Sequence, residues 1–295
     1  MFAVRFMLRK RIAKPWIMVL PSLCVMLAVV IFPLLYSLRL SFIQWDALVP
    51  GQKFVGFKNF VQVLLDKRFL ASLIHTGVLL AGIITIEFLL GFLLALCLLE
   101  EFKLKKLVTA TFILPVTIIP TVTGFIWKLM LDARYGPINH MLSIMFRRDV
   151  QYTWLAHTNT AYLSLIITDV WQWTPFMILV LLAGLVALPK DTLEAADIDG
   201  ASEWQKIRFV TLPMLKPVIV VALLIRSLDL LKLFDIVFAM TQGGPGTSTE
   251  TLSYYIYRNG FEYFRMGYTA AMSYVVLVIV SIIITFLLQR LGEVT

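Results

Sequence analysis

The 295-residue sequence has few of the residue types that build redox and metal sites, with two cysteines and three histidines. Cys24 and Cys97 lie in separate apolar runs, so they do not indicate a disulfide framework or a thiolate metal site. His75, His140 and His157 are scattered and lack the paired spacing of a histidine metal site. We therefore expect this chain to hold no metal.

Motifs for nucleotide binding and covalent catalysis are also missing. The sequence has no G-x-x-x-x-G-K-[ST], H-E-x-x-H, G-x-S-x-G or C-x-x-C pattern. The double glycine Gly243-Gly244 is followed by Pro-Gly-Thr, which does not form a phosphate cradle. The chain is therefore not expected to be an enzyme or to bind a cofactor. If it moves a solute uphill, the energy must come from an ion gradient or from another polypeptide.

Charged residues are scarce and apolar residues are abundant. Only 15% of the residues are charged, 60% are hydrophobic, and the mean hydropathy is +0.86. The apolar residues gather in blocks of about twenty or more, the length needed to cross a bilayer as a helix. The net charge of +8 comes largely from basic residues that flank these blocks. Basic residues in that position meet anionic lipid headgroups, so we expect a membrane lipid partner and no nucleic acid.

The pattern predicts an all-α membrane protein in which residues 1–295 form a single transmembrane domain. Pro115 and Pro120 interrupt the third span. The first apolar run is too long for a secretory signal peptide, so we expect an uncleaved first span. The six expected spans are 16–40, 70–99, 107–131, 161–188, 215–240 and 268–288.

The orientation follows from the basic residues before the first span. Arg5, Arg9, Lys10, Arg11 and Lys14 precede it, which favours a cytoplasmic N-terminus in a plasma membrane. With six spans, the C-terminus is then cytoplasmic too. The same topology places the connection 189–213 in the cytoplasm.

This connection is longer than a simple helix–helix turn requires. Asp199-Gly200 is a turn or helix-stop pair, and Ser202 followed by Gln205 fits a capping box. The pattern predicts two short amphipathic helices separated by the glycine. Such a pair can lie on lipid or can dock a soluble partner, and the residues alone do not choose between the two.

Four charges lie in or near the fifth expected span: Arg226, Asp229, Lys232 and Asp235 are three apart with alternating sign. Neighbours at this spacing can pair on a helix. Arg226 is near the middle of the span and must face protein or a water-filled space. Asp235 is near the outer end and can be interfacial.

One interpretation is a polar pathway through the membrane, because aromatic and charged side chains together suit a sugar. The alternative is a set of buried ion pairs that lock helices together. A proton relay in an ion-coupled secondary transporter would use the same residue types. The candidate pathway residues are Glu87, Asp169, Trp171, Trp173, Arg226, Asp229 and Lys232.

The connection 189–213 resembles the signature loop of permease subunits from binding-protein-dependent ABC importers. That loop reads E-A-A, three residues, G, nine residues, I-x-L-P. This sequence has E-A-A at 194–196, Gly200, and V-T-L-P at 210–213, so valine replaces isoleucine. Further pieces resemble the maltose-type and glycerol-phosphate-type branch, and the resemblance covers about residues 15–290. These pieces are G-F-K-N-F (56–60), W-x-W-T-P-F (171–176), A-L-P-K (187–190), F-D-I (234–236), T-Q-G-G-P-G (241–246) and T-E-T-L (249–252).

The resemblance implies a type I importer permease fold with cytoplasmic coupling helices, most similar to the first permease of a heteromeric pair. It implies a second homologous permease subunit and two cytoplasmic ATPase subunits, which would bind ATP and Mg²⁺. It also implies an extracytoplasmic solute-binding protein and a carbohydrate substrate, either a sugar, an oligosaccharide or a polyol. The resemblance carries over Glu194 and Gly200 as motif residues. The residues expected in ATPase coupling are Glu194, Ala195, Ala196, Asp199, Gly200, Trp204, Leu212 and Pro213.

The resemblance fixes no sugar contacts, so the pathway residues rest on physical reasoning alone. An ion-coupled secondary transporter of a small polar solute remains the alternative function. A membrane-embedded enzyme is disfavoured, because no nucleophile or metal constellation is recognisable.

Overall fold

The computed structural model describes residues 19–292, with side chains through residue 285, and this part of the chain is mainly helical. The expected basic N-terminal segment and the end of the tail lie outside the described residues. Within the described part, five helices are long and apolar enough to cross a membrane, or six if one bent pair counts as one span. The expected all-α membrane fold is confirmed.

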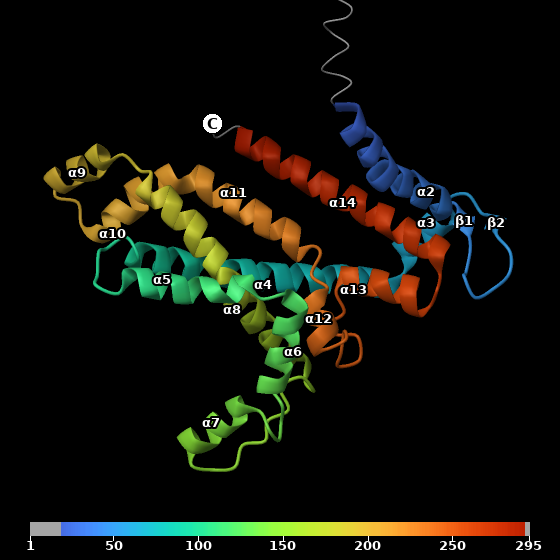
Figure 1. Cartoon of the computed structure of the whole chain (residues 1–295), viewed down its shortest axis with the longest axis horizontal. Helices are drawn as coiled ribbons and strands as arrows, with labels where there is room; N and C mark the ends of the chain where they lie inside the picture. The colour runs from blue at the N-terminus through green and yellow to red at the C-terminus, as the bar shows by residue number, and fades with distance from the viewer. Residues whose placement is uncertain (1–18, 293–295) are drawn as a thin grey trace, which may run out of the picture. The chain divides into compact units, whose positions relative to one another are not determined.

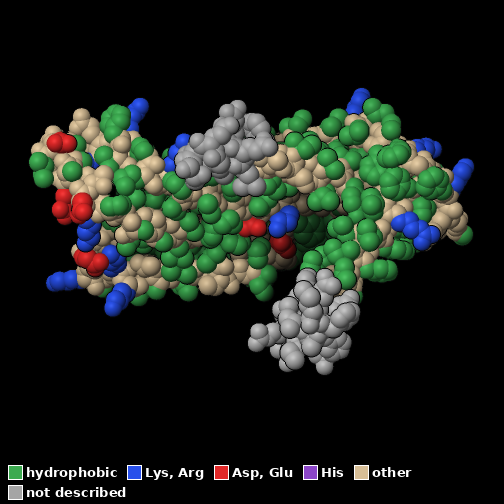
Figure 2. Space-filling view, turned by 90° about the horizontal axis from the view of Figure 1, so that it is seen from above, with side chains coloured by type: hydrophobic (Ala, Val, Ile, Leu, Met, Phe, Trp, Pro, Cys, Tyr) green, Lys and Arg blue, Asp and Glu red, His purple; other side chains and the backbone are tan. Residues whose placement is uncertain are grey.

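The chain divides into two compact units, which are described separately. The first contains residues up to Asp66 together with Ile256–Ile282, and the second contains Lys67–Tyr255 with the remaining tail. Figure 2 shows one face of the molecule, on which hydrophobic side chains outnumber charged ones. A surface of this kind suits a lipid environment.

The first unit contains two spans. One is the helix Val19–Ser41, which includes η1 (Leu27–Ile31) and α2 (Phe32–Ser41), and the other is α14 (Met266–Gly292). The Tyr274 hydroxyl on α14 donates a hydrogen bond of 2.5 Å to the Leu34 carbonyl on α2. This bond satisfies a polar group in a region where water is scarce.

The G-F-K-N-F motif (56–60) forms hydrogen bonds to the segment that follows the first span. Strand β1 (Ile43–Gln44) pairs antiparallel with β2 (Lys53–Phe54), and α3 (Lys58–Leu65) follows. The buried Asn59 amide donates to the carbonyls of Ser41 (2.9 Å) and Ile43 (3.0 Å). At Gly267 a Cβ atom would lie 1.9 Å from the Ile43 carbonyl oxygen, so only glycine allows this close approach.

The core of the second unit is built on two long helices that lie side by side, α4 (Lys67–Cys97) and α8 (Thr158–Val186) (Figure 1). Helix α11 (Leu212–Leu230) packs on both of them. A Cβ atom at Gly91 would lie 2.6 Å from Met177 Cγ, and one at Gly184 would lie 2.7 Å from Leu215 Cδ1. Small residues therefore bring the helices close together, as is common for helices in membranes.

The third span is sharply bent. Helix α5 (Lys105–Ile113) continues into η2 (Leu114–Thr117), and α6 (Pro120–Met130) then leaves at 100° (Figure 1). Both residues between them, Ile118 and Ile119, have extended backbones. The Gln172 amide on α8 donates to the Ile118 carbonyl at 2.7 Å, which satisfies a backbone group released by the break. The prolines indicated this break, but not its angle.

The fifth span ends earlier than expected, because α11 ends at Leu230 and not at residue 240. A separate short helix, α12 (Asp235–Met240), follows and packs on α6. The carbonyls left free at the end of α11 accept hydrogen bonds from distant hydroxyls, Thr251 to Leu233 at 2.7 Å and Ser253 to Leu231 at 3.2 Å. Local sequence patterns do not show such long-range caps.

The motifs T-Q-G-G-P-G and T-E-T-L form one folded loop, which leads into α13 (Leu252–Tyr257) and η4 (Arg258–Glu262). Arg68 of α4 makes a bidentate ion pair with the buried Glu250. Its Nε lies 2.6 Å from Oε2 and its Nη2 lies 2.9 Å from Oε1. Tyr162 of α8 donates to the Ser248 carbonyl at 2.7 Å. Two core helices therefore hold this loop in place.

Candidate functional site: a helical knob and a charged pocket

The connection between α8 and α11 folds into two short helices, as the sequence predicts. They are α9 (Lys190–Ile198) and α10 (Glu203–Lys206), and η3 (Ile207–Thr211) joins α10 to α11 (Figure 1). Gly200 lies between them with a φ of +76°, a left-handed conformation that favours glycine. The capping box is confirmed. Ser202 N–H donates to Gln205 Oε1 at 2.8 Å, and Gln205 N–H donates to Ser202 Oγ at 3.4 Å.

One ion pair, between Lys206 and Asp197, links the two short helices. The Lys206 ammonium on α10 lies 2.6 Å from Asp197 Oδ1 on α9 and 2.5 Å from Glu203 Oε1. The Ala201 amide also donates to the Ala196 carbonyl at 3.0 Å. The pair therefore has fixed internal geometry and is directly continuous with α11.

The knob formed by residues 190–211 presents apolar side chains to its surroundings. Ile198 is 87% exposed, Trp204 is 66% exposed and Phe209 is 69% exposed. These apolar side chains, exposed in a mainly polar segment, are candidates for an interaction surface. Of the residues expected to act here, Ala196 and Leu212 are half-buried, and the others are exposed: Glu194, Ala195, Asp199, Gly200, Trp204 and Pro213. The sequence reasoning missed Ile198 and Phe209, although both are apolar residues in a mainly polar run.

A buried charge cluster lies in the second unit. Arg226 on α11 donates from Nε and Nη2 to the two carboxylate oxygens of Glu87 on α4, at 2.8 and 2.7 Å. Its Nη2 also donates to Asp169 Oδ1 on α8 at 2.5 Å. The guanidinium lies over the Trp173 ring, 4.9 Å from its centroid. All three charged side chains are at most 3% exposed, so the cluster ties three core helices together in a low-dielectric environment.

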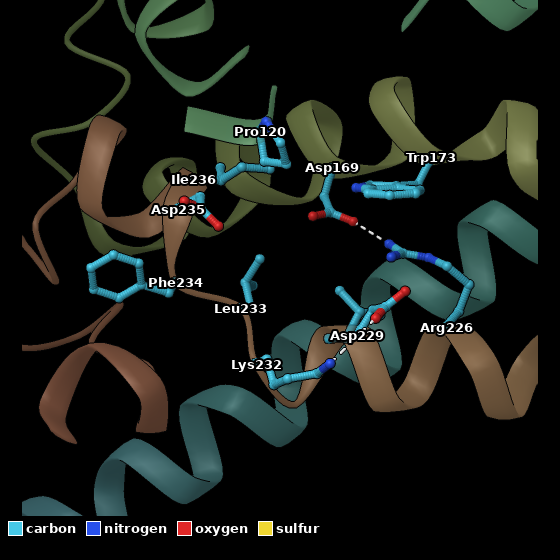
Figure 3. A pocket seen from close by; sticks show the side chains of 11 residues that line it. Pro120, Asp169, Trp173, Arg226, Asp229, Lys232, Leu233, Phe234, Asp235 and Ile236 are labelled. Atoms are coloured by element: carbon cyan, nitrogen blue, oxygen red, sulfur yellow. Dashed lines mark hydrogen bonds and ion pairs between the residues drawn. The ribbon is translucent and has the colours of Figure 1, made fainter. Parts of the chain in front are cut away.

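A cavity of about 220 Å³ opens beside this cluster (Figure 3). Asp169 and Trp173 reach it from α8, and Arg226 and Asp229 reach it from α11. Lys232 Nζ lies 3.7 Å from Asp229 Oδ1, and these two side chains are 76% and 43% exposed. The cavity therefore combines accessible charges of both signs with an aromatic face.

Two of the seven expected pathway residues, Trp171 and Glu87, do not line the charged cavity. Trp171 points into a different, almost wholly apolar cavity of about 600 Å³, where its ring contacts Trp127 edge-on at 5.9 Å. Glu87 contacts Arg226 and does not line the charged cavity. The other five expected residues do line it: Asp169, Trp173, Arg226, Asp229 and Lys232.

Further lining residues come from the break in the fifth span and from the bent third span. Phe234 directly precedes α12, and Asp235 is the first residue of α12. Pro120 is the first residue of α6. Thr121 donates to Asp235 Oδ1 at 2.7 Å, which links these two helices. In the sequence Asp235 fits an interfacial position, and only the break after Leu230 turns it toward this cavity. Among residues 19–292, no cluster of three or more His, Cys, Asp or Glu side chains is arranged to hold a metal ion.

Comparison with known proteins decides the family. Residues 87–293 match the family model described as the binding-protein-dependent transport system inner membrane component. The chain belongs to this family. It is therefore a transport-system permease subunit of an inner membrane and not an enzyme, and nothing favours the ion-coupled alternative.

Relatives and solved structures agree with this assignment. The chain is 39% identical to a probable ABC transporter permease protein of Sinorhizobium fredii, over 98% of this chain and 93% of that protein. It is 37% identical to a trehalose/maltose transport system permease protein of Thermococcus litoralis, over 85% and 83% of the two chains. A bacterial ABC transporter involved in the import of the acidic polysaccharide alginate superposes with a TM-score of 0.85, 25% identity, and coverage of 98% and 99%. The same type of transporter, in complex with a periplasmic protein that holds an alginate pentasaccharide, gives a TM-score of 0.80 at 26% identity. The type I ABC importer permease fold is confirmed.

Proposed function

We propose that this permease imports a carbohydrate and that ATPase subunits drive it through the knob of residues 190–211. The observation that carries the coupling role is the exposed, internally fixed apolar surface of this knob, formed by Ile198, Trp204 and Phe209. A lipid-lying helix pair would also expose apolar residues. The E-A-A…G motif in the same segment favours a protein partner.

The proposed assembly contains this chain, a second homologous permease, two cytoplasmic ATPase subunits that bind ATP and Mg²⁺, and a solute-binding protein outside. It places both termini and the knob in the cytoplasm. Support for a binding protein comes from the related transporter that is described in complex with its periplasmic protein. The second permease and the ATPases follow from the family alone.

The mechanism follows from chain connectivity. Helix α8 leads into the knob and α11 leads out of it, so a displacement of the knob pulls on both helices. Both also carry residues of the charged cavity, Asp169 on α8 and Asp229 on α11. Closure of the ATPases would move the knob as a rigid body and would switch the cavity between inward and outward access.

For the substrate we propose a sugar, an oligosaccharide or a polyol that passes through the charged cavity. The face of Trp173 suits the apolar face of a sugar ring, while Asp229 and Lys232 can bind its hydroxyls. Relatives named for trehalose and maltose transport support this class. Trp171 is not part of this proposed site.

The test is transport in proteoliposomes that contain the full assembly. We expect ATP-dependent sugar uptake that is lost when Ile198 and Trp204 are both replaced by serine, together with loss of ATPase binding in a pull-down. Val186 is 69% exposed but lies on the long helix α8, so Val186→Ser serves as the control and should leave ATPase binding intact. Gradient-driven uptake by this chain alone, or unaltered ATPase binding by the double variant, would contradict the proposal.

A second experiment tests the cavity. Asp229→Ala should leave the assembly and its ATPase binding intact while it reduces uptake. Trp171→Phe, outside the cavity, is the matched control and should leave uptake unchanged. Normal uptake by Asp229→Ala would remove this residue from the pathway without affecting the coupling proposal.

A further inference from the structure

Helix α7 (Pro137–Phe146) has an apolar face that no part of the described chain covers. Met141, Ile144 and Met145 share one side of the helix and are 68%, 66% and 65% exposed. Phe146 extends this face at the C-terminal end and is 54% exposed. Figure 1 shows α7 standing away from the α4–α8 core of its unit, beyond the end of α6.

The opposite side of α7 is firmly held. The Asn139 amide donates to the Tyr152 carbonyl at 2.9 Å and accepts from the Trp154 indole at 2.8 Å. Ser143 Oγ accepts from the Val150 amide at 2.9 Å. The helix therefore has a fixed inner face that is tied to the following segment, so the exposure of Met141 and its neighbours is not the result of a frayed or unfolded helix.

Two cations border the apolar face. Arg147 and Arg148 follow the last turn, are exposed, and make no ion pair with any described side chain. The Arg148 guanidinium lies 5.8 Å from the centroid of the Phe146 ring. Cations at a helix C-terminus also suit the helix dipole, but the dipole does not explain the adjacent apolar face. Asp149 lies next to them and accepts from the Gln151 amide at 2.9 Å.

Helix α7 is tethered between two membrane-spanning segments. It starts seven residues after Met130, where α6 ends, and α8 begins at Thr158. Tyr135 (89% exposed) and Tyr152 (42% exposed) flank it. Aromatic residues of this kind are enriched where a protein crosses the headgroup region.

We propose that α7 lies in the headgroup layer of the membrane, with its Met141–Ile144–Met145 face toward the acyl chains and Arg147 and Arg148 on anionic headgroups. An apolar face bordered by basic residues and tethered close to membrane spans is the pattern of an interfacial helix. A docked protein would instead need acidic groups to match the two arginines. Lipid supplies both the apolar layer and the negative charge.

The test uses the full chain reconstituted in vesicles of phosphatidylcholine, with or without added phosphatidylglycerol. Cys24 and Cys97 are replaced by serine, and a single cysteine at Met145→Cys carries an environment-sensitive fluorophore. We expect blue-shifted emission and quenching by lipids brominated on the acyl chains, and a stronger effect in the vesicles that contain phosphatidylglycerol. Gln151→Cys, an exposed polar position nearby, is the matched control and should show neither effect.

Arg147→Gln with Arg148→Gln should abolish the dependence on phosphatidylglycerol while it leaves part of the quenching at position 145. Water-like emission at position 145 without lipid quenching would overturn the proposal. Protection of that fluorophore only after addition of the solute-binding protein or the second permease would also overturn it, because the face would then belong to a protein interface. An unchanged melting temperature would show that the variants are folded.

Discussion

Arg226 and Glu87 face each other through two parallel hydrogen bonds of 2.8 and 2.7 Å, and both side chains are buried between α11 and α4. Asp169 on α8 accepts a third bond from the same guanidinium. Sequence spacing suggests pairing of Arg226 with Asp229 one turn along the same helix. The structure instead pairs Arg226 across helices, and Asp229 lies near Lys232. Both interpretations of these charges, a pathway and a helix lock, therefore have a structural counterpart.

The first prediction concerns removal of the central cation. Arg226→Met should destabilise the protein strongly, by about 3–5 kcal/mol, because two carboxylates would remain buried without a cation. Thermal unfolding in detergent would measure this. Lys232→Met is the matched control, since its ion pair is exposed and worth about 0–1 kcal/mol. Equal melting temperatures for the two variants would contradict the structural role of the cluster.

The second prediction separates stability from transport. Glu87→Leu, Asp169→Leu and Arg226→Met together should recover most of the stability that Arg226→Met alone loses, because apolar replacement of a whole buried ion cluster is often neutral. Uptake should stay low, since Asp169 and Arg226 line the charged cavity. A folded triple variant with normal uptake would show that the cluster is only a helix lock.

The third prediction tests the contact between α6 and α12. A Cβ atom at Gly124 would lie 2.6 Å from Ala239 Cβ, so Gly124→Ala should cost about 1–3 kcal/mol. Gly77→Ala on α4 is the control. Nothing lies within 4 Å of a Cβ there, so alanine should be neutral or stabilise by up to about 1 kcal/mol. Ala239→Gly should rescue Gly124→Ala in melting experiments, and failure of that rescue would argue against this packing.

The fourth prediction concerns acid sensitivity of the turn after α6. The amides of Tyr135 and Arg134 both donate to Asp132 Oδ1 at 2.9 Å, and these bonds lower the pKa of the Asp132 carboxyl from its ordinary value of 3.8. A lowered pKa in the folded state stabilises the turn above pH 3.8. That contribution is lost as the pH falls through the lower, folded value.

Hydrogen exchange of the amides of Arg134 and Tyr135, corrected for intrinsic rates, should therefore accelerate below pH 3.8. Asp132→Asn keeps an acceptor oxygen but cannot titrate, so its corrected exchange should lose this pH dependence. The same acceleration in both proteins would assign the effect to another group.

Sequence reasoning predicted the elements whose signals are local. The capping box at Ser202 and Gln205 and the break marked by Pro115 and Pro120 are confirmed because short-range chemistry determines them. The sequence predicts that the fifth span continues to residue 240, whereas α11 ends at Leu230. The hydroxyl of Thr251, which bonds the Leu233 carbonyl after this end, is distant in sequence and gives no local signal. Trp171 and Trp173 are two residues apart on one helix and so point to different sides, into different cavities. The partners of a buried charge depend on which helices meet, and a single sequence does not contain that information directly.

The last prediction concerns Gly200, the turn residue between α9 and α10. Its φ of +76° makes any β-branched residue strained, by about 1–3 kcal/mol, even though open space surrounds it. Gly200→Val should therefore change the angle between α9 and α10 without clashing, and should abolish ATP-driven uptake while the long helices remain inserted. Gly200→Asn should retain more activity, because asparagine tolerates the left-handed region better.

The matched control for Gly200 is Gly51, which has a φ of +106° and equally open surroundings but lies in the loop between β1 and β2. Gly51→Val should cause similar local strain and leave ATPase binding unchanged. ATPase binding by pull-down and uptake in proteoliposomes would be compared for all three variants. If Gly200→Val keeps both activities, the precise geometry of the knob does not matter for coupling; if Gly51→Val loses ATPase binding as well, the loss reflects general misfolding. Loss confined to Gly200→Val would tie the left-handed backbone at this one position to the transfer of motion from the ATPases to α8 and α11.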